Sequence, residues 1–166
     1  ILLFTGSAIS RKGFDVLIRA FIEVCRSFPD SVLLIAGPAN SHENPSLDEA
    51  FIEEQKRLLS SNGLSDQVKF LGLVRDRQVL AKVFQVANVF VFPSRMEGLG
   101  YVVLEAMASS LPIVDSDLPV LEEIITSGEN GIKEPIGDAI ATADAVSALL
   151  EDEGKRMRLG IAAQGD

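Results

Sequence analysis

The sequence is poor in the residues that most often carry catalysis or metal binding, with one histidine and one cysteine among 166 residues. A single cysteine cannot form an internal disulfide, and these two residues cannot supply a zinc site or a Ser-His-Asp triad. Basic residues are also scarce, because 15 Lys and Arg stand against 24 Asp and Glu, for a formal net charge of -9. Nucleic acids need clustered positive charge, so no nucleic-acid partner is expected.

Long apolar runs are lacking as well, since none approaches the ~20 residues of a membrane-spanning helix. The N-terminus has no basic segment with a cleavage site, so we expect a cytoplasmic protein that contacts a membrane only through a part not included here. The chain begins at Ile1 inside an expected strand, without an initiator Met, which suggests a piece of a longer protein. With 47% hydrophobic residues, we expect one domain over residues 1–166.

Strand and helix patterns alternate along the chain. The apolar run at 32–36 lacks a period of two, which predicts strands buried on both faces of a parallel sheet. Strands are predicted at 1–5, 31–36, 67–72, 88–92, 112–116 and 131–134, and helices at about 13–28, 47–61, 76–86, 99–109, 119–127 and 138–152. The predicted fold class is α/β: a doubly wound, mostly parallel sheet of about six strands with helices on both faces. Ligands of such sheets bind at the carboxyl ends of the strands.

The most informative segment is 93–108, where Glu97 and Glu105 flank a glycine turn and an apolar helix. Gly98 and Gly100 let an anion approach the helix start, where unpaired N–H groups and the helix dipole favour a phosphate or diphosphate. Glu105 has apolar neighbours, which predicts a carboxylate on a buried helix that needs a partner. Both carboxylates could bind a polyol; the alternative is an Arg salt bridge for Glu105 and a solvated position for Glu97.

Four other polar features each have a functional and a structural interpretation. Lys12 follows the first strand, where its ammonium could neutralise a phosphate; the alternative is an exposed lysine at a helix start. Cys25 falls on a helical apolar stripe and is expected in the core, whereas His42 is expected to be solvated in a loop. The Asp115-Ser116-Asp117 segment has a metal-binding form, but we favour an Asp helix cap.

Two nucleotide-binding motifs are absent. Gly98-x-Gly100 lacks the third glycine of the dinucleotide fingerprint, because position 103 is Val, so an NAD enzyme is disfavoured. Lys12-Gly13 reverses the order that a P-loop requires, so ATPase or GTPase chemistry is unsupported. A phosphate-accepting receiver domain would need an Asp at the end of the third strand, where this chain has Gly72.

The spacing Glu-x7-Glu, within Pro-Ser-x-x-Glu-Gly-x-Gly and followed by Leu-Glu-Ala-Met-Ala, resembles the donor-binding motif of the family-four retaining glycosyltransferases, which have the GT-B fold. The resemblance runs from Phe4 to about Leu150 and includes Lys12-Gly13 and the segment 70–74. It implies that the chain is the C-terminal, Rossmann-like half that binds a nucleotide sugar. A second, N-terminal domain, absent here, would supply the acceptor site.

The resemblance also implies residue roles. Glu105 would bind the ribose hydroxyls and Glu97 the sugar hydroxyls near the reacting carbon, with Glu97 and Lys12 as the catalytic pair. The diphosphate would lie against Lys12 and the backbone of the turn, and the further donor-binding residues would be Gly6, Ser7, Val74, Arg75, Gly98, Leu99, Gly100 and Tyr101. A hexosyl group would pass from a UDP-, GDP- or ADP-linked sugar by front-face displacement, without a metal or other cofactor.

Two positions depart from the family pattern. Ser7 stands where the family usually has an Arg that contacts the diphosphate, and Arg11 could replace it or face solvent. Pro119-Val120 stands where many relatives have a Gly-Gly pair, while Glu123 on the expected next helix is interpreted as structural. The alternative function is therefore a degenerate, non-catalytic nucleotide-binding or assembly module.

Overall fold

The structure is a computed structural model that describes residues 1–165, and a parallel sheet forms its centre. Six strands lie in the order β3-β2-β1-β4-β5-β6, and every neighbouring pair is parallel. The strands are β1 (Leu2–Thr5), β2 (Leu33–Ala36), β3 (Val68–Gly72), β4 (Val89–Phe92), β5 (Ile113–Ser116) and β6 (Ile132–Glu134). All six predicted strands are confirmed.

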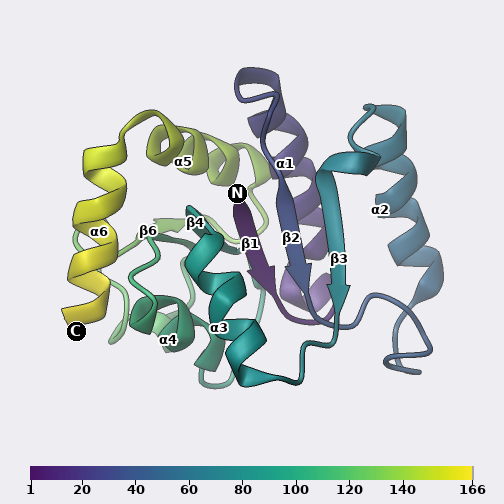
Figure 1. Cartoon of the computed structure of the whole chain (residues 1–166), viewed down its shortest axis with the longest axis horizontal. Helices are drawn as coiled ribbons and strands as arrows, with labels where there is room; N and C mark the ends of the chain where they lie inside the picture. The colour runs from purple at the N-terminus through teal and green to yellow at the C-terminus, as the bar shows by residue number, and fades with distance from the viewer. Residues whose placement is uncertain (166) are drawn as a thin grey trace.

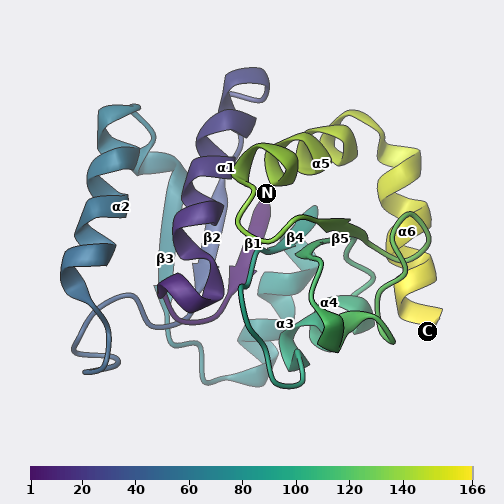
Figure 2. The same cartoon turned by 180° about the vertical axis from the view of Figure 1, so that it is seen from behind.

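Helices cover both faces of this sheet. They are α1 (Phe14–Ser27), α2 (Glu49–Ser61), α3 (Arg77–Val86), α4 (Tyr101–Ala108), α5 (Ala139–Glu151) and α6 (Glu153–Gly165). Helices α3 and α4 lie on the face seen in Figure 1, and α1, α2 and α5 lie on the face seen in Figure 2. Leu159 and Ala163 of α6 join different core clusters, one on each side of the sheet. The doubly wound α/β prediction is confirmed.

Local sequence accounts for where these helices begin. Asp48, Asp76 and Asp138 cap α2, α3 and α5, since each carboxylate accepts a hydrogen bond from a first-turn N–H. Helix α1 presents an apolar stripe to the sheet, and Cys25 lies on it, buried as predicted. Burial raises the pKa of the Cys25 thiol to about 11, so the thiol stays protonated at neutral pH.

The predicted helix at 119–127 is wrong, because only the 3-10 helix Pro119–Leu121 forms there, followed by turns. Asn130 explains where the helical pattern ends. Its side-chain oxygen accepts a hydrogen bond from the N–H of Thr126 at 2.8 Å, and its amide donates to the carbonyl of Ile124 at 2.9 Å. A side chain thus takes backbone groups that a longer helix would pair internally. Within residues 1–165, no helix has the length and apolar character to cross a membrane.

Candidate donor site at the switch point of the sheet

The strand order reverses between β1 and β4, which are neighbours although 84 residues separate Thr5 from Val89. The chain leaves β1 through residues 6–13 and leaves β4 through residues 93–100. One loop thus comes from the half of the sheet formed by β1 to β3 and the other from the half formed by β4 to β6, and both lie at this edge. Ligands of open parallel sheets bind at such a switch point. The two loops contain Lys12 and Glu97, the residues that the sequence analysis proposed as a catalytic pair.

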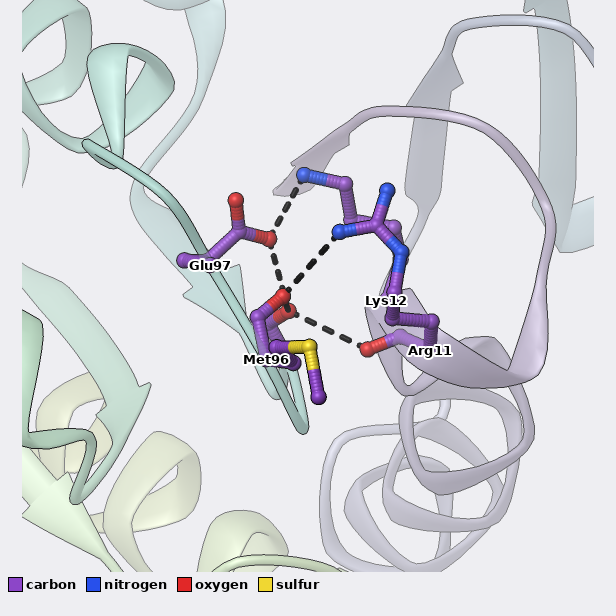
Figure 3. A network of polar contacts seen from close by, with 5 residues as sticks. Arg11, Lys12, Met96 and Glu97 are labelled. Atoms are coloured by element: carbon purple, nitrogen blue, oxygen red, sulfur yellow. Dashed lines mark hydrogen bonds and ion pairs between the residues drawn. The ribbon is translucent and has the colours of Figure 1, made fainter.

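Lys12 and Glu97 form an ion pair, with 2.6 Å between Lys12 Nζ and Glu97 Oε1 (Figure 3). Only 17% of the lysine side chain and 7% of the glutamate side chain are exposed. The Lys12 ammonium also lies 5.6 Å from the centre of the Phe92 ring, a distance at which a cation is attracted to an aromatic face. The solvated alternatives for Glu97 and Lys12 are therefore wrong, since neither side chain lies free in water.

Ser94 completes this polar cluster, although the sequence analysis did not select it. Its hydroxyl lies 2.7 Å from Glu97 Oε1, the shortest of its three polar contacts, so Glu97 accepts hydrogen bonds from both Lys12 and Ser94. Arg11 does not face solvent alone, because its Nη1 donates to the carbonyl of Met96 at 3.3 Å. The position of Ser94, two residues after the end of β4 and three residues before Glu97, is the signal that could have identified it.

The turn before α4 has the backbone geometry that its glycines predicted. Gly100 is left-handed, with φ of 62° and ψ of 34°, and a Cβ at this position would lie 2.7 Å from a methyl carbon of Leu121. Gly98, Leu99 and Tyr101 are exposed beside it. The N–H of Val103 donates to the carbonyl of Gly100 at 2.8 Å, and the N–H groups that precede it in the first turn of a helix have no acceptor within that helix. The turn can therefore offer donors to a ligand at the same edge as Lys12.

Glu105 departs from the prediction. Helix α4 is not buried all round, because Val103, Ala106 and Met107 face the core while Leu104 and Glu105 are exposed. An apolar sequence was interpreted as an apolar environment, but eight residues on the outside of a sheet bury one face only. Glu105 therefore needs no buried partner, and the argument that burial demands one is wrong. Its assignment to the ribose stays a prediction that rests on the family resemblance.

The remaining predicted contacts lie on both sides of the Lys12–Glu97 pair. A Cβ added at Gly6 would lie 3.8 Å from Lys12 Cδ, so the end of β1 directly adjoins the pair, and Ser7 is half-buried next to it. Val74 is half-buried and Arg75 is exposed in the loop after β3. Because β3 is the edge strand, two strands away from β1, these residues lie farther along the same rim.

The Asp115-Ser116-Asp117 segment does not act as a unit. Asp115 is 2% exposed, and neither of its carboxylate oxygens has a hydrogen-bond partner among the described residues. Asp117 is exposed and lies 3.4 Å from Lys133 Nζ. Neither caps a helix, since the 3-10 helix that follows begins at Pro119 and its capping position is Leu118, with no side-chain cap, so the cap prediction is wrong. Across residues 1–165, no group of three or more metal-binding side chains gathers.

Desolvation by burial raises the pKa of Asp115 to about 7, although the charge of Lys133 acts in the opposite direction. Sequence reasoning gave no signal for this group beyond the metal-like motif. His42 is exposed, as predicted, and Glu123 is exposed in the turns that replace the expected helix.

Comparison with known proteins places this geometry in a family. The pattern that describes the family Glycosyl transferases group 1 matches residues 1–166. The chain belongs to this family. A D-inositol 3-phosphate glycosyltransferase of Corynebacterium diphtheriae is 33% identical over 98% of this chain and 37% of its own length. The chain spans less than half the length of this relative and of other curated relatives that it matches.

Solved structures confirm the GT-B type of fold. The C-terminal domain of a group 1 glycosyl transferase, LpcC, from Francisella tularensis superposes with a TM-score of 0.87 at 24% identity, over 99% of this chain and 82% of that one. Anabaena HepE in complex with UDP superposes with a TM-score of 0.85 at 23% identity, over 99% of this chain and 43% of that one. The resemblance found in the sequence, to a C-terminal half of this fold, is confirmed.

Proposed function

We propose that the chain is the donor-binding domain of a retaining glycosyltransferase that transfers a hexosyl group from a nucleotide diphosphate sugar. The observation that carries the proposal is the Lys12–Glu97 ion pair at the switch point between β1 and β4. A lysine ammonium has three N–H donors, so Lys12 can keep its bond to Glu97 and still donate to a diphosphate. HepE, a protein of the same fold, was solved with UDP, which supports a nucleoside diphosphate as the ligand.

In this proposal the two halves of the ion pair have different tasks. Lys12 stabilises negative charge on the diphosphate leaving group, and the turn at 98–101 adds backbone N–H donors and the positive end of α4. Glu97, oriented by Lys12 and Ser94, accepts hydrogen bonds from sugar hydroxyls and so fixes the sugar near the reacting carbon. Glu105 accepts bonds from the ribose, and the base lies toward Val74 and Arg75.

The acceptor belongs to an N-terminal domain in the parent protein, which we place in the cytoplasm with membrane contact only through that domain. Transfer then needs both domains around one cleft. The 166-residue chain alone should therefore bind nucleoside diphosphates and transfer no sugar. Turnover by this chain without a second domain would contradict the division of labour.

Binding is tested by a thermal-shift panel of UDP, GDP and ADP and their hexose derivatives, followed by calorimetric titration of the best ligand. A ligand that binds only the folded chain raises its melting temperature by mass action. For the retaining outcome, the anomeric configuration of the product of the full-length protein is read by proton NMR. An inverted product would overturn that part of the proposal.

A second candidate is a degenerate, non-catalytic module, and Ser7 and Pro119-Val120 favour it. The loop after β5 begins a 3-10 helix at Pro119, which has no N–H to offer a phosphate. Calorimetry separates the proposed function from an assembly module, because an assembly module would show no saturable binding of any nucleotide diphosphate sugar in the panel. A nucleotide-binding module would bind, but the full-length protein would then transfer no sugar.

A further inference from the structure

Arg95 links the loop after β4 to the start of α1. Its Nη1 and Nη2 donate to the two carboxylate oxygens of Asp15 at 2.7 and 2.8 Å, which is a bidentate ion pair. Nη1 also donates to the carbonyl oxygen of Ser10 at 2.6 Å. Paired N–H donors on a planar guanidinium fix the relative orientation of the groups they join, which a lysine cannot do as well.

The backbones of the two loops that this ion pair joins are also in close contact. The N–H of Arg95 donates to the carbonyl of Arg11 at 2.9 Å. A Cβ at Gly13, whose φ is 69°, would lie 1.7 Å from the carbonyl oxygen of Pro93, so only a glycine permits this approach. The loops at 10–13 and 93–97 therefore pack backbone against backbone, and the Arg95–Asp15 ion pair adds a side-chain link between them.

The segments that Arg95 joins are the ones that carry the two site residues. Ser10 precedes Lys12 by two residues, and Arg95 precedes Glu97 by two residues. The contacts of Arg95 thus restrain both backbone segments from which the Lys12 and Glu97 side chains project. A shift of either loop would change the 2.6 Å contact between Lys12 and Glu97.

The charges of the pair are compensated within it. Burial alone would raise the pKa of Asp15, but the hydrogen bonds and charge of Arg95 outweigh burial and hold it below its usual value. Asp15 therefore stays ionised at neutral pH and bound to Arg95. Since its guanidinium is engaged by Asp15 and Ser10, Arg95 does not stand in for the diphosphate-binding Arg that Ser7 replaces.

We propose that Arg95 and Asp15 are positioning residues for donor binding, which hold Lys12 and Glu97 at the spacing that the diphosphate sugar requires. The inference rests on the proposed function, because it assigns the ion pair a task only through the Lys12–Glu97 site. Neither residue contacts the donor, and both act through the loops that they join.

The test is a double-mutant cycle in the 166-residue chain with Arg95→Gln, Asp15→Asn and both together, titrated with UDP, GDP and ADP and with the free nucleosides. Each single substitution should weaken binding of the preferred nucleoside diphosphate about tenfold, and the double substitution should lose no more than either. Nucleoside affinity should stay unchanged. Arg95→Lys, which keeps the charge without the planar guanidinium, should recover part of the loss.

Arg26→Gln is the matched control, because Arg26 also forms a 2.7 Å ion pair, with Glu23 on α1, outside the two loops. It should leave every affinity unchanged. Equal losses for nucleoside and diphosphate, or independent effects of Arg95 and Asp15, would overturn the inference. Stronger binding in Asp15→Asn would also overturn it, since a released Arg95 would then serve the ligand directly.

Failure of the proposed function is distinguishable from failure of this inference. If the unmodified chain binds none of the nucleoside diphosphates, the proposed function is wrong. Amide hydrogen exchange at 95–97 then decides the structural claim: faster exchange confined to these loops in Arg95→Gln supports the restraint, and unchanged exchange overturns it. If the unmodified chain binds and the variants bind equally well, only the positioning role is wrong.

Discussion

The loop after β4 and the end of the adjacent strand β5 lie at the same edge of the sheet, yet the carboxylates that they carry, Glu97 and Asp115, have opposite surroundings. Glu97 receives hydrogen bonds from Lys12 and Ser94. Asp115 is buried more deeply than Glu97 and has no hydrogen-bond partner for its carboxylate oxygens among the described residues. The difference comes from the neighbouring elements, because the loop after β1 brings Lys12 to β4, whereas Lys133 of β6 lies against Asp117.

Among the substitutions at these two carboxylate sites, Asp115→Asn should cause the largest change, and the change is in the free energy of unfolding. In the folded chain burial raises the pKa of Asp115 to about 7, well above its value in the unfolded chain. Between about pH 4 and pH 7 the folded state therefore keeps a proton that the unfolded state has lost, and the free energy of unfolding falls as pH rises. Asn has no proton to lose in this range, so the variant should not show this pH-dependent fall in the free energy of unfolding. At pH 8 it should be more stable than the original chain by up to roughly 4 kcal/mol. Chemical denaturation of both chains at pH 4, 6 and 8 measures the difference in the free energy of unfolding.

Asp117→Asn is the control, because Asp117 lies two residues after Asp115, just beyond the end of β5, and is exposed. It should leave the pH dependence of unfolding almost unchanged. A variant Asp115→Asn that is less stable than the original chain at pH 8 would show that the carboxylate is ionised and bound by Lys133.

Lys12→Ala addresses the other loop. It removes a charge-assisted contact, so affinity for a nucleoside diphosphate should fall by roughly 1.5 to 3 kcal/mol, while affinity for the free nucleoside should barely change. Lys56→Ala is a close control, because Lys56 also pairs with a glutamate, at 2.8 Å, and lies 5.7 Å from the centre of an aromatic ring, that of Phe70. Calorimetry of both variants should show a loss for Lys12 only. An equal loss for nucleoside and diphosphate would contradict the role of Lys12.

Gly100→Ala tests the contact between the two loops. At φ of 62° a side chain is strained, and its Cβ would lie 2.7 Å from Leu121, so the free energy of unfolding should fall by about 2 kcal/mol. Gly98→Ala should stay within about 0.5 kcal/mol, because no atom lies within 4 Å of its added Cβ. If denaturant titration gave the same change in the free energy of unfolding for Gly100→Ala and Gly98→Ala, the backbone at Gly100 would be able to rearrange to accept a side chain.

The sequence predicted the parts of this fold that depend on local pattern. The alternation of strand and helix patterns located all six strands. The glycine-turn motif at 93–108 and Lys12 located two loops that the strand order brings together. Contacts between distant segments could not be predicted, because Arg95 and Asp15, or Asp115 and Lys133, meet only through the order of strands and loops. Burial was misjudged because composition was used in place of position: α4 is apolar in sequence but exposes one face. The helix expected at 119–127 was wrong because Asn130 bonds the backbone of Ile124 and Thr126, a contact that a helical pattern does not reveal.

Glu105→Gln should have the smallest effect and tests the corrected environment of that residue. Because Glu105 is exposed, loss of its charge should change the free energy of unfolding by less than about 0.5 kcal/mol. If Glu105 binds the ribose, it does so beside water and contributes as an ordinary hydrogen bond, so ribonucleotide affinity should fall by about 0.5 to 1.5 kcal/mol. Titration with the ribonucleotide and the 2′-deoxyribonucleotide isolates the contact with the ribose. The substitution should narrow the difference in affinity between these two ligands. An unchanged preference for ribose would remove Glu105 from the site and leave Glu97 as its only carboxylate from this motif.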